Sequence, residues 1–252
     1  MAESIECKTD LTGLFDEDDY MYFYGEEITE KRADEVVQFL IDELEMSKPM
    51  SILDVGCRYG RYSIKLAERG HHVTGLDNVE GFLNQARQNA QEMNLKVNFL
   101  NKDMRCIEYN GEFDRAMVMF TGFGNYTDDQ NLEVLKNVSK SLDNSGLFCL
   151  DTFSRDAFLK EFIPYFVLEK NEDLLIDRNT FDPKTGRLIN NRIIIRDGKR
   201  KDTPSVIRLY YYNEIERMLH EAGMVIEKIF GGWDKSPFTK DSKGMKIIAK
   251  KF

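Results

Sequence analysis

Two aspartates and two glycines in the first third of the chain have the spacing of a nucleotide pocket. Asp54 lies near the end of an apolar run of strand length, and Gly56 and Gly60 bound the short loop that follows it. Asp77 ends the next short apolar run, and a carboxylate about 20 residues beyond a glycine loop can accept both hydroxyls of a ribose. The pattern therefore predicts a pocket for a nucleoside-containing cofactor.

The charge and the glycine spacing of this loop disfavour a dinucleotide. A pyrophosphate sits on a helix N-terminus behind a G-x-G-x-x-G loop, whereas Ser63 stands here where the third glycine would fall. The carboxylate of Asp54 would also repel a pyrophosphate. It would not repel S-adenosylmethionine, which carries a sulfonium, an ammonium and only one carboxylate. S-adenosylmethionine is therefore the favoured cofactor, and a nicotinamide-dependent oxidoreductase stays as an alternative.

Residues 53–60 read Leu-Asp-Val-Gly-Cys-Arg-Tyr-Gly and resemble the L-D-x-G-C-G-x-G signature of class I S-adenosylmethionine-dependent methyltransferases. Arg58 departs from that signature because it replaces the usual middle glycine. Its side chain must point away from the cofactor or form part of the pocket wall. The residues that the resemblance assigns to the cofactor in this region are Asp54, Gly56, Cys57, Arg58, Gly60, Asp77 and Asn78.

The resemblance extends to the segments on either side. Asp103 follows a short strand predicted at 97–100, where similar methyltransferases use an acid to accept the adenine amino group while the next residue, Met104, packs on the ring. A loop or cap carboxylate is the alternative for Asp103. In glycine and sarcosine N-methyltransferases and similar enzymes, an Arg on the helix before the first strand holds the cofactor carboxylate, which here implies Arg32. Aromatic residues ahead of that helix cover the cofactor in those enzymes, which implies Tyr20, Tyr22 and Tyr24 or, alternatively, a segment merely stapled to the core.

A glycine-rich aromatic loop at 121–126 follows the strand predicted at 113–120, whose last residue, Phe120, is expected beside the cofactor. The loop resembles the F-G-Y turn of bacterial and archaeal small-molecule methyltransferases. It lacks the Asn-Pro-Pro-Tyr or Asp-Pro-Pro-Tyr tetrapeptide of nucleic-acid amino-methyltransferases, and no carboxylate ends this strand to help hold Mg²⁺. We therefore expect no metal. Phe123 and Tyr126 are expected in the acceptor pocket, with core packing as the alternative.

The elements that position these residues alternate between strands and helices as far as residue 153, which predicts a doubly wound α/β sheet. Extended runs separated by turn signals at 182–186 and 197–198 then predict an antiparallel meander before the last helix. Two final strands, at 224–230 and 246–250, resemble the reversed hairpin of class I methyltransferases. The predicted fold is a Rossmann-like, seven-stranded, mostly parallel sheet with a reversed C-terminal β-hairpin and an inserted antiparallel β lid.

This order divides the chain into four parts built around one core. They are an N-terminal aromatic lid segment (1–28), the methyltransferase core (29–163), the inserted lid (164–212) and the C-terminal part of the core (213–252). Arginines recur through the inserted lid, where they could contact an anionic acceptor or simply solvate one face of the sheet. Trp233 could line the acceptor pocket or anchor its loop. The residues expected in the acceptor pocket are Tyr22, Phe123, Tyr126, Arg178, Tyr210 and Trp233.

The composition of the chain limits the classes of partner that we expect it to bind. The chain has 252 residues and a formal net charge of -9, and no run of Lys and Arg forms the basic stripe that a nucleic-acid-binding protein needs. The four cysteines are far apart, which is typical of free thiols in a reducing cytoplasm. No apolar run approaches the roughly 18 residues of a membrane span. We expect a cytoplasmic protein, a monomer or homodimer, with neither a nucleic-acid nor a membrane partner.

Together these patterns predict methyl transfer to a small-molecule acceptor. No His or carboxylate stands out as a general base in the acceptor region, which is compatible with in-line N-methylation because a neutral amine needs little help from a base. A small-molecule O-methyltransferase and a non-catalytic protein that binds S-adenosylmethionine are the alternatives.

Overall fold

The computed structural model describes residues 16–27, 29–120 and 122–252. Most of the N-terminal segment predicted at 1–28 therefore lies outside the described residues, and so does Cys7. The described chain has a seven-stranded central sheet with the strand order β10-β11-β5-β4-β1-β2-β3. Its parallel strands are β1 (Ser51–Val55), β2 (His72–Asp77), β3 (Asn98–Asn101), β4 (Phe113–Val118) and β5 (Leu142–Phe153).

The C-terminal hairpin runs in the reverse direction. β11 (Gly244–Lys251) lies between β10 (Met224–Phe230) and β5, and it is antiparallel to both. The doubly wound sheet and its reversed hairpin are confirmed. All five parallel strands therefore end at one edge of the sheet, where loops from several strands can meet around a ligand.

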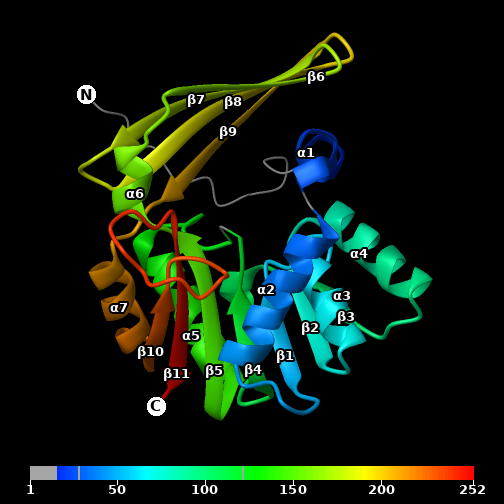
Figure 1. Ribbon diagram of the computed structural model, residues 1–252, viewed down its shortest axis with the longest axis vertical. Helices are drawn as coiled ribbons and strands as arrows, with labels where there is room; N and C mark the ends of the chain where they lie inside the picture. The colour runs from blue at the N-terminus through cyan, green and yellow to red at the C-terminus, as the bar shows by residue number, and fades with distance from the viewer. Residues whose placement is uncertain (1–15, 28, 121) are drawn as a thin grey trace.

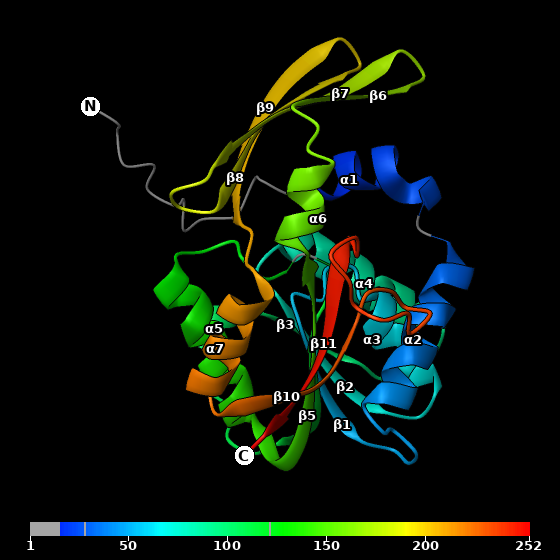
Figure 2. The ribbon, with the colours of Figure 1, turned by 60° about the vertical axis from the view of Figure 1, so that its left-hand side comes forward.

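Helices cover both faces of the sheet (Figure 2). α2 (Glu30–Glu43), α3 (Arg61–Glu68) and α4 (Glu80–Glu92) lie on one face, and α5 (Asp128–Ser141) and α7 (Tyr212–Glu221) lie on the other. α5 begins at the predicted capping box, in which Thr127 and Gln130 exchange side-chain and backbone hydrogen bonds. None of the described helices is both long and apolar enough to cross a membrane.

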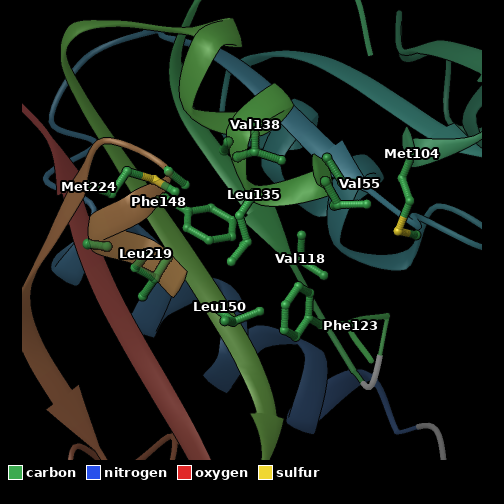
Figure 3. Close-up of a cluster of buried hydrophobic side chains, with 14 of the residues drawn as sticks. Val55, Met104, Val118, Phe123, Leu135, Val138, Phe148, Leu150, Leu219 and Met224 are labelled. Atoms are coloured by element: carbon green, nitrogen blue, oxygen red, sulfur yellow. The ribbon is translucent and has the colours of Figure 1, made fainter. Parts of the chain in front are cut away.

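A hydrophobic core fills the space between the sheet, α5 and α7 (Figure 3). Val55 and Val118, at the ends of two neighbouring strands, belong to it, as do Leu135 of α5 and Leu219 of α7. These strands are apolar on both faces because helices cover both faces. The core therefore holds the carboxyl ends of the strands in a fixed arrangement.

The insertion forms a second sheet beyond the carboxyl ends of the parallel strands (Figure 1). The short helix α6 (Arg155–Lys160) leads from β5 into it, and four antiparallel strands follow: β6 (Tyr165–Lys170), β7 (Asp173–Asp182), β8 (Arg187–Arg196) and β9 (Lys199–Arg208). Asp197 and Gly198, with φ of 51° and 68°, form the two-residue turn between β8 and β9. The expected antiparallel β insertion is confirmed.

The N-terminal helix α1 (Glu17–Tyr24) is docked on this second sheet. Phe23 packs against Leu175 of β7 and Ile194 of β8. Asp16 and Asp19 both form ion pairs with Lys201 of β9, at 2.6 and 3.3 Å. The acidic and aromatic residues of this segment thus hold it against the inserted sheet, and the 3₁₀ turn η1 (Gly25–Glu27) then leads toward α2.

Candidate functional site

The loop after β1 is tied to the end of β2. The backbone N–H groups of Gly56 and Cys57 both donate to the carbonyl of Leu76, at 2.8 and 3.0 Å. Gly60 begins α3 with φ of 74°, and a Cβ there would lie 2.6 Å from the ring of Phe99. Only glycine fits at that position, because a side chain would be both strained and in collision. Gly60 thus lets the start of α3 lie directly against Phe99 of β3 and Ala86 of α4.

Asp77 is held in one orientation at the end of β2. Its side chain is only 8% exposed, Oδ2 accepts a hydrogen bond from the backbone N–H of Arg58 at 3.0 Å, and Oδ1 accepts one from Val79 at 2.9 Å. Burial raises the pKa of this carboxyl, and the two N–H groups act against that rise. Each oxygen keeps a lone pair with which it can accept a further hydrogen bond.

Asp103 and Met104 follow β3, the strand that pairs with the end of β2. Leu76 and Asp77 of β2 pair with residues of β3, and the 3₁₀ helix η2 (Met104–Cys106) follows β3, with Asp103 as its N-cap. The methyl group of Met104 would lie 3.4 Å from a Cβ placed on Gly56. Although burial acts to raise it, hydrogen bonds from Arg105 hold the pKa of Asp103 below its usual value, and Arg105 Nη2 lies 2.6 Å from Oδ2. The side chain of Arg105 thus donates to both oxygens of this carboxylate.

Asp54 is the most buried acid of the site, with 1% of its surface exposed. Ser63 donates a hydrogen bond from Oγ to Oδ2 at 2.6 Å. Burial raises the pKa of Asp54 to about 7; the hydrogen bond from Ser63 opposes the rise and the charge of Asp77 adds to it. This carboxyl therefore changes its charge near neutral pH.

A cavity of about 470 Å³ opens at this edge of the sheet, a size typical of small-molecule sites. Its walls come from the glycine loop, the first turns of α2 and α3, the ends of β4 and β5, α1 and the inserted strand β8. The lining residues are Tyr20, Tyr24, Arg32, Asp54, Gly56, Cys57, Arg58, Tyr59, Arg61, Tyr62, Met119, Phe120, Phe153 and Arg192.

The side chain of Arg58 forms part of the cavity wall, which is one of the two orientations expected from its place in the loop. It adopts φ of 51°, in the left-handed region that glycine normally occupies. Its Nη1 donates to the hydroxyl of Tyr20 at 3.1 Å, and the guanidinium lies 5.2 Å from the centre of that ring. Nη2 lies 3.5 Å from the carbonyl of Phe120. Arg58 thus links the loop to α1 and to the end of β4.

A buried ion pair between Asp151 and Lys246 is hydrogen-bonded to the backbone of Phe120. The backbone N–H of Phe120 donates to Oδ2 of Asp151 at 3.2 Å, and the other carboxylate oxygen lies 3.1 Å from Nζ of Lys246. Phe120 has φ of 51°, an unfavourable conformation for a residue with a side chain. The hydrogen bond to Asp151 helps to hold that conformation at the cavity wall.

None of the six residues expected in the acceptor pocket is among the described residues that line the cavity, and three of them lie in other parts of the molecule. Arg178 is exposed on β7, because the alternation of a strand turns its neighbour Asp177 inward instead. Trp233 packs edge-on against Phe39 of α2, with ring centres 5.0 Å apart. Tyr22 donates from its hydroxyl to the carbonyl of Lys170 in the inserted sheet.

Phe123, Tyr126 and Tyr210 lie in the hydrophobic core instead of on the described cavity wall (Figure 3 shows Phe123). The ring centres of Phe123 and Tyr210 are 5.5 Å apart. Asn131 of α5 donates from Nδ2 to the carbonyl of Tyr126 and to the hydroxyl of Tyr210, at 3.1 and 2.9 Å. These contacts are those of core packing, the alternative given for Phe123 and Tyr126. Through them the loop joins α5 to the end of the insertion.

Sequence reasoning did not select several residues that line the cavity. Tyr59 lies within the glycine loop and Arg61 and Tyr62 directly after it, so proximity to that loop was the available signal. Arg192 is one of several arginines in the insertion. It lines the cavity because of the direction in which its side chain leaves β8. The cavity residues absent from the prediction are Tyr59, Arg61, Tyr62, Met119, Phe153 and Arg192.

Comparisons with known proteins agree with this geometry. Residues 52–146 match the family model of a methyltransferase domain. YqeM, a putative methyltransferase of Bacillus subtilis (strain 168), is 28% identical over 195 residues, which cover 74% of this chain and 78% of that protein. The structure of the CcbJ methyltransferase from Streptomyces caelestis superposes with a TM-score of 0.79 at 16% identity, over 92% of this chain and 96% of that one.

A third protein of similar fold has its cofactor bound. CalS10 from Micromonospora echinaspora, an amino pentose methyltransferase with S-adenosylmethionine bound, has a TM-score of 0.70 at 18% identity, over 94% of this chain and 98% of that one. The family match begins in β1 and runs past α5, so it contains the glycine loop, Asp77 and Asp103. The match over residues 52–146 and the shared fold support the class I S-adenosylmethionine-dependent methyltransferase superfamily, with S-adenosylmethionine as the cofactor.

Proposed function

We propose that this enzyme transfers the methyl group to an amine of a small molecule, by in-line displacement and without a metal. The observation that carries the proposal is the cavity beside the glycine loop, which α1 and β8 cover. A cavity of about 470 Å³ under such a cover suits a small acceptor better than a nucleic-acid strand. The similarity of fold to an amino pentose methyltransferase supports an amine as the acceptor.

The cofactor is proposed to lie across the loop from Asp77 to Arg32. Asp77 would accept both ribose hydroxyls, and Asp103 would accept the adenine amino group while Met104 packs on the ring. The backbone of the loop would hold the methionine portion. Arg32 would bind its carboxylate, and Asp54 would bind its ammonium group. In this arrangement the sulfonium faces the aromatic part of the cavity, next to Phe120.

The chemistry of the cavity residues suits an acceptor that needs little help from a base. Burial raises the pKa values of Tyr59 and Tyr62, so both hydroxyls stay protonated at neutral pH. Asp54, the one carboxylate among the described lining residues, accepts a hydrogen bond from Ser63. The protein would then act by holding the amine lone pair behind the methyl carbon in a dry pocket, and such orientation can supply roughly 7 to 11 kcal/mol.

The proposal predicts that the protein methylates amines in a panel of small acceptors. The panel contains primary amines, phenols and alcohols, each incubated with S-adenosylmethionine and analysed by mass spectrometry for a gain of one CH₂ unit and for S-adenosylhomocysteine. Methylated amines, with the phenols and alcohols unchanged, are the expected result. Methylation confined to the hydroxyl compounds would replace this assignment by O-methylation, and failure to bind S-adenosylhomocysteine in calorimetry would overturn it altogether.

Cofactor affinity is expected to fall as the pH drops below about 7. The raised pKa of Asp54 means that its carboxyl becomes neutral in that range, and a neutral carboxyl cannot pair with the cofactor ammonium. One proton linked to binding makes the Kd of S-adenosylhomocysteine roughly tenfold higher at pH 6 than at pH 8. Asp77 also has a raised pKa and acts in the same direction, so Asp54→Asn is the control. A variant as pH-dependent as the wild type would contradict the role of Asp54.

A further inference from the structure

The cavity has a charge opposite to that of the whole protein. The chain carries a formal net charge of -9, yet four arginines line the cavity: Arg32, Arg58, Arg61 and Arg192. Asp54 is the one carboxylate among the described lining residues, and its pKa of about 7 leaves it only partly ionised at neutral pH. The wall of the cavity is therefore cationic before any ligand enters.

Within the described part of the chain, two of these arginines form no direct ion pair with an acidic side chain. Neither Arg32 nor Arg61 forms an ion pair with any residue in the ranges 16–27, 29–120 and 122–252. Arg61 donates from Nη2 to the carbonyl of Thr29 at 2.7 Å, which is a neutral acceptor. Arg192 differs because Asp177 accepts two hydrogen bonds from it, at 2.7 and 2.9 Å. Asp151 lies near enough to Arg32 for the positive charge to counteract the rise in the pKa of that carboxyl, so uncompensated cationic charge remains mainly at Arg61.

A buried hydroxyl lies next to Arg61 and has no hydrogen-bond partner among the residues that the structure describes. Tyr62 is 7% exposed and lines the cavity, and its hydroxyl is fully buried. The guanidinium of Arg61 lies 5.5 Å from the centre of the Tyr62 ring. Because its hydroxyl is fully buried, Tyr62 contributes its ring to the cavity wall beside Arg61.

The cofactor cannot neutralise the cavity by itself. S-adenosylmethionine brings two positive groups and one carboxylate, so its binding adds a net positive charge beside the arginines. Its carboxylate can pair with one of the two unpaired arginines, proposed above to be Arg32. A second anionic group, brought by the acceptor, would offset the charge that remains at Arg61.

We propose that the methyl acceptor is itself an anion, with a carboxylate or phosphate group bound by Arg61. This inference rests on the proposed function, since it names the class of substrate for the same cavity. The planar fork of an arginine matches both groups, and the surrounding tyrosines offer contact to a ring or an apolar stem. Arg192 closes the same cavity from the lid side.

The experiment titrates aromatic probes into the protein saturated with S-adenosylhomocysteine. Benzoate and phenyl phosphate carry the two anionic groups, benzyl alcohol is their neutral counterpart, and calorimetry gives each Kd. At least one of the two anions is expected to bind roughly tenfold or more tightly than the alcohol, and the tighter of the two identifies the group. Arg61→Gln is expected to remove that difference while the Kd of S-adenosylhomocysteine changes less than about threefold.

Two further variants serve as controls for Arg61→Gln. Arg178→Gln makes the same change of charge on the exposed side of β7, and anion binding is expected to stay at the wild-type level. The double variant Asp177→Asn with Arg192→Gln removes the lid-side pair without leaving a buried lone charge, and it is expected to weaken anion binding less than Arg61→Gln does. If Arg178→Gln weakens anion binding as much as Arg61→Gln, the attraction is a property of the surface and the inference falls.

The remaining outcomes separate this inference from the proposed function. Normal binding of S-adenosylhomocysteine with anions no tighter than the alcohol overturns the anionic acceptor and leaves the methyltransferase reaction intact. Equal losses of cofactor and anion affinity in Arg61→Gln assign Arg61 to the cofactor carboxylate and also overturn the inference. A protein that does not bind S-adenosylhomocysteine at all overturns both proposals.

Discussion

Replacing Asp151 with Asn is expected to lower the free energy of unfolding by about 3 to 5 kcal/mol. Asp151 of β5 and Lys246 of β11 form an ion pair at 3.1 Å, and each side chain is only 11% exposed. Burial raises the pKa of Asp151 even though Lys246 opposes the rise, so this pair already carries a desolvation cost. The substitution would leave Lys246 buried beside the Trp233 ring with no counter-charge. Chemical denaturation of both proteins measures the difference.

The matched control is the double variant Asp151→Asn with Lys246→Met, which should recover most of the lost stability. The amide oxygen that Asp151→Asn introduces can still accept the hydrogen bond from the backbone of Phe120, and Met fills much of the volume of the lysine stem without its charge. A single variant as stable as the wild type would show that the lysine ammonium reaches water, contrary to the burial described above. A double variant no more stable than the single one would place the loss in packing instead of charge.

The central sheet could be predicted from the sequence because its signals are local. Apolar runs such as residues 51–55 have strand length, and the turn at Asp197 and Gly198 requires residues that tolerate positive φ. The loop after β1 could be predicted for the same reason, since Gly56 and Gly60 stand where the backbone adopts a positive φ. These features depend on a few neighbouring residues, and no distant contact overrides them.

The lining of the cavity could not be predicted in the same way, because it depends on which way side chains face. Arg178 and Arg192 are both arginines in the insertion, but the register of β7 and β8 turns Asp177 inward to meet Arg192 and leaves Arg178 exposed. Trp233 finds its partner, Phe39, nearly two hundred residues earlier in the chain. Neither outcome follows from local sequence, since both depend on how separate elements pack.

The role of the loop after β4 could not be predicted from its sequence either. Its aromatic residues fit an acceptor pocket and a core equally well by type, and the structure buries Phe123 and Tyr126 under α5. Gly124, with φ of 99°, lies where a Cβ would come within 2.6 Å of the Arg208 carbonyl. The loop is therefore a joint between the core and the end of the inserted sheet.

Asp77→Ala is expected to weaken the binding of S-adenosylhomocysteine by about 1.5 to 3 kcal/mol, roughly ten- to more than hundredfold in Kd. The carboxylate is fixed by the backbone N–H groups of Arg58 and Val79, so its free lone pairs are already oriented before the ribose arrives. Alanine removes the acceptor of both proposed ribose contacts and leaves those two N–H groups without a partner. Isothermal titration calorimetry measures the change.

The control for Asp77→Ala is Asp129→Ala, which makes the same change of charge at an exposed position in the first turn of α5. Its Kd for S-adenosylhomocysteine is expected to equal that of the wild type, because the site lies at the ends of other elements. Thermal unfolding of both variants separates a lost contact from a collapsed loop, since only a folded Asp77→Ala protein reports on the ribose. A folded variant that binds with wild-type affinity would remove Asp77 from the cofactor site, and with it the orientation of the cofactor across the loop.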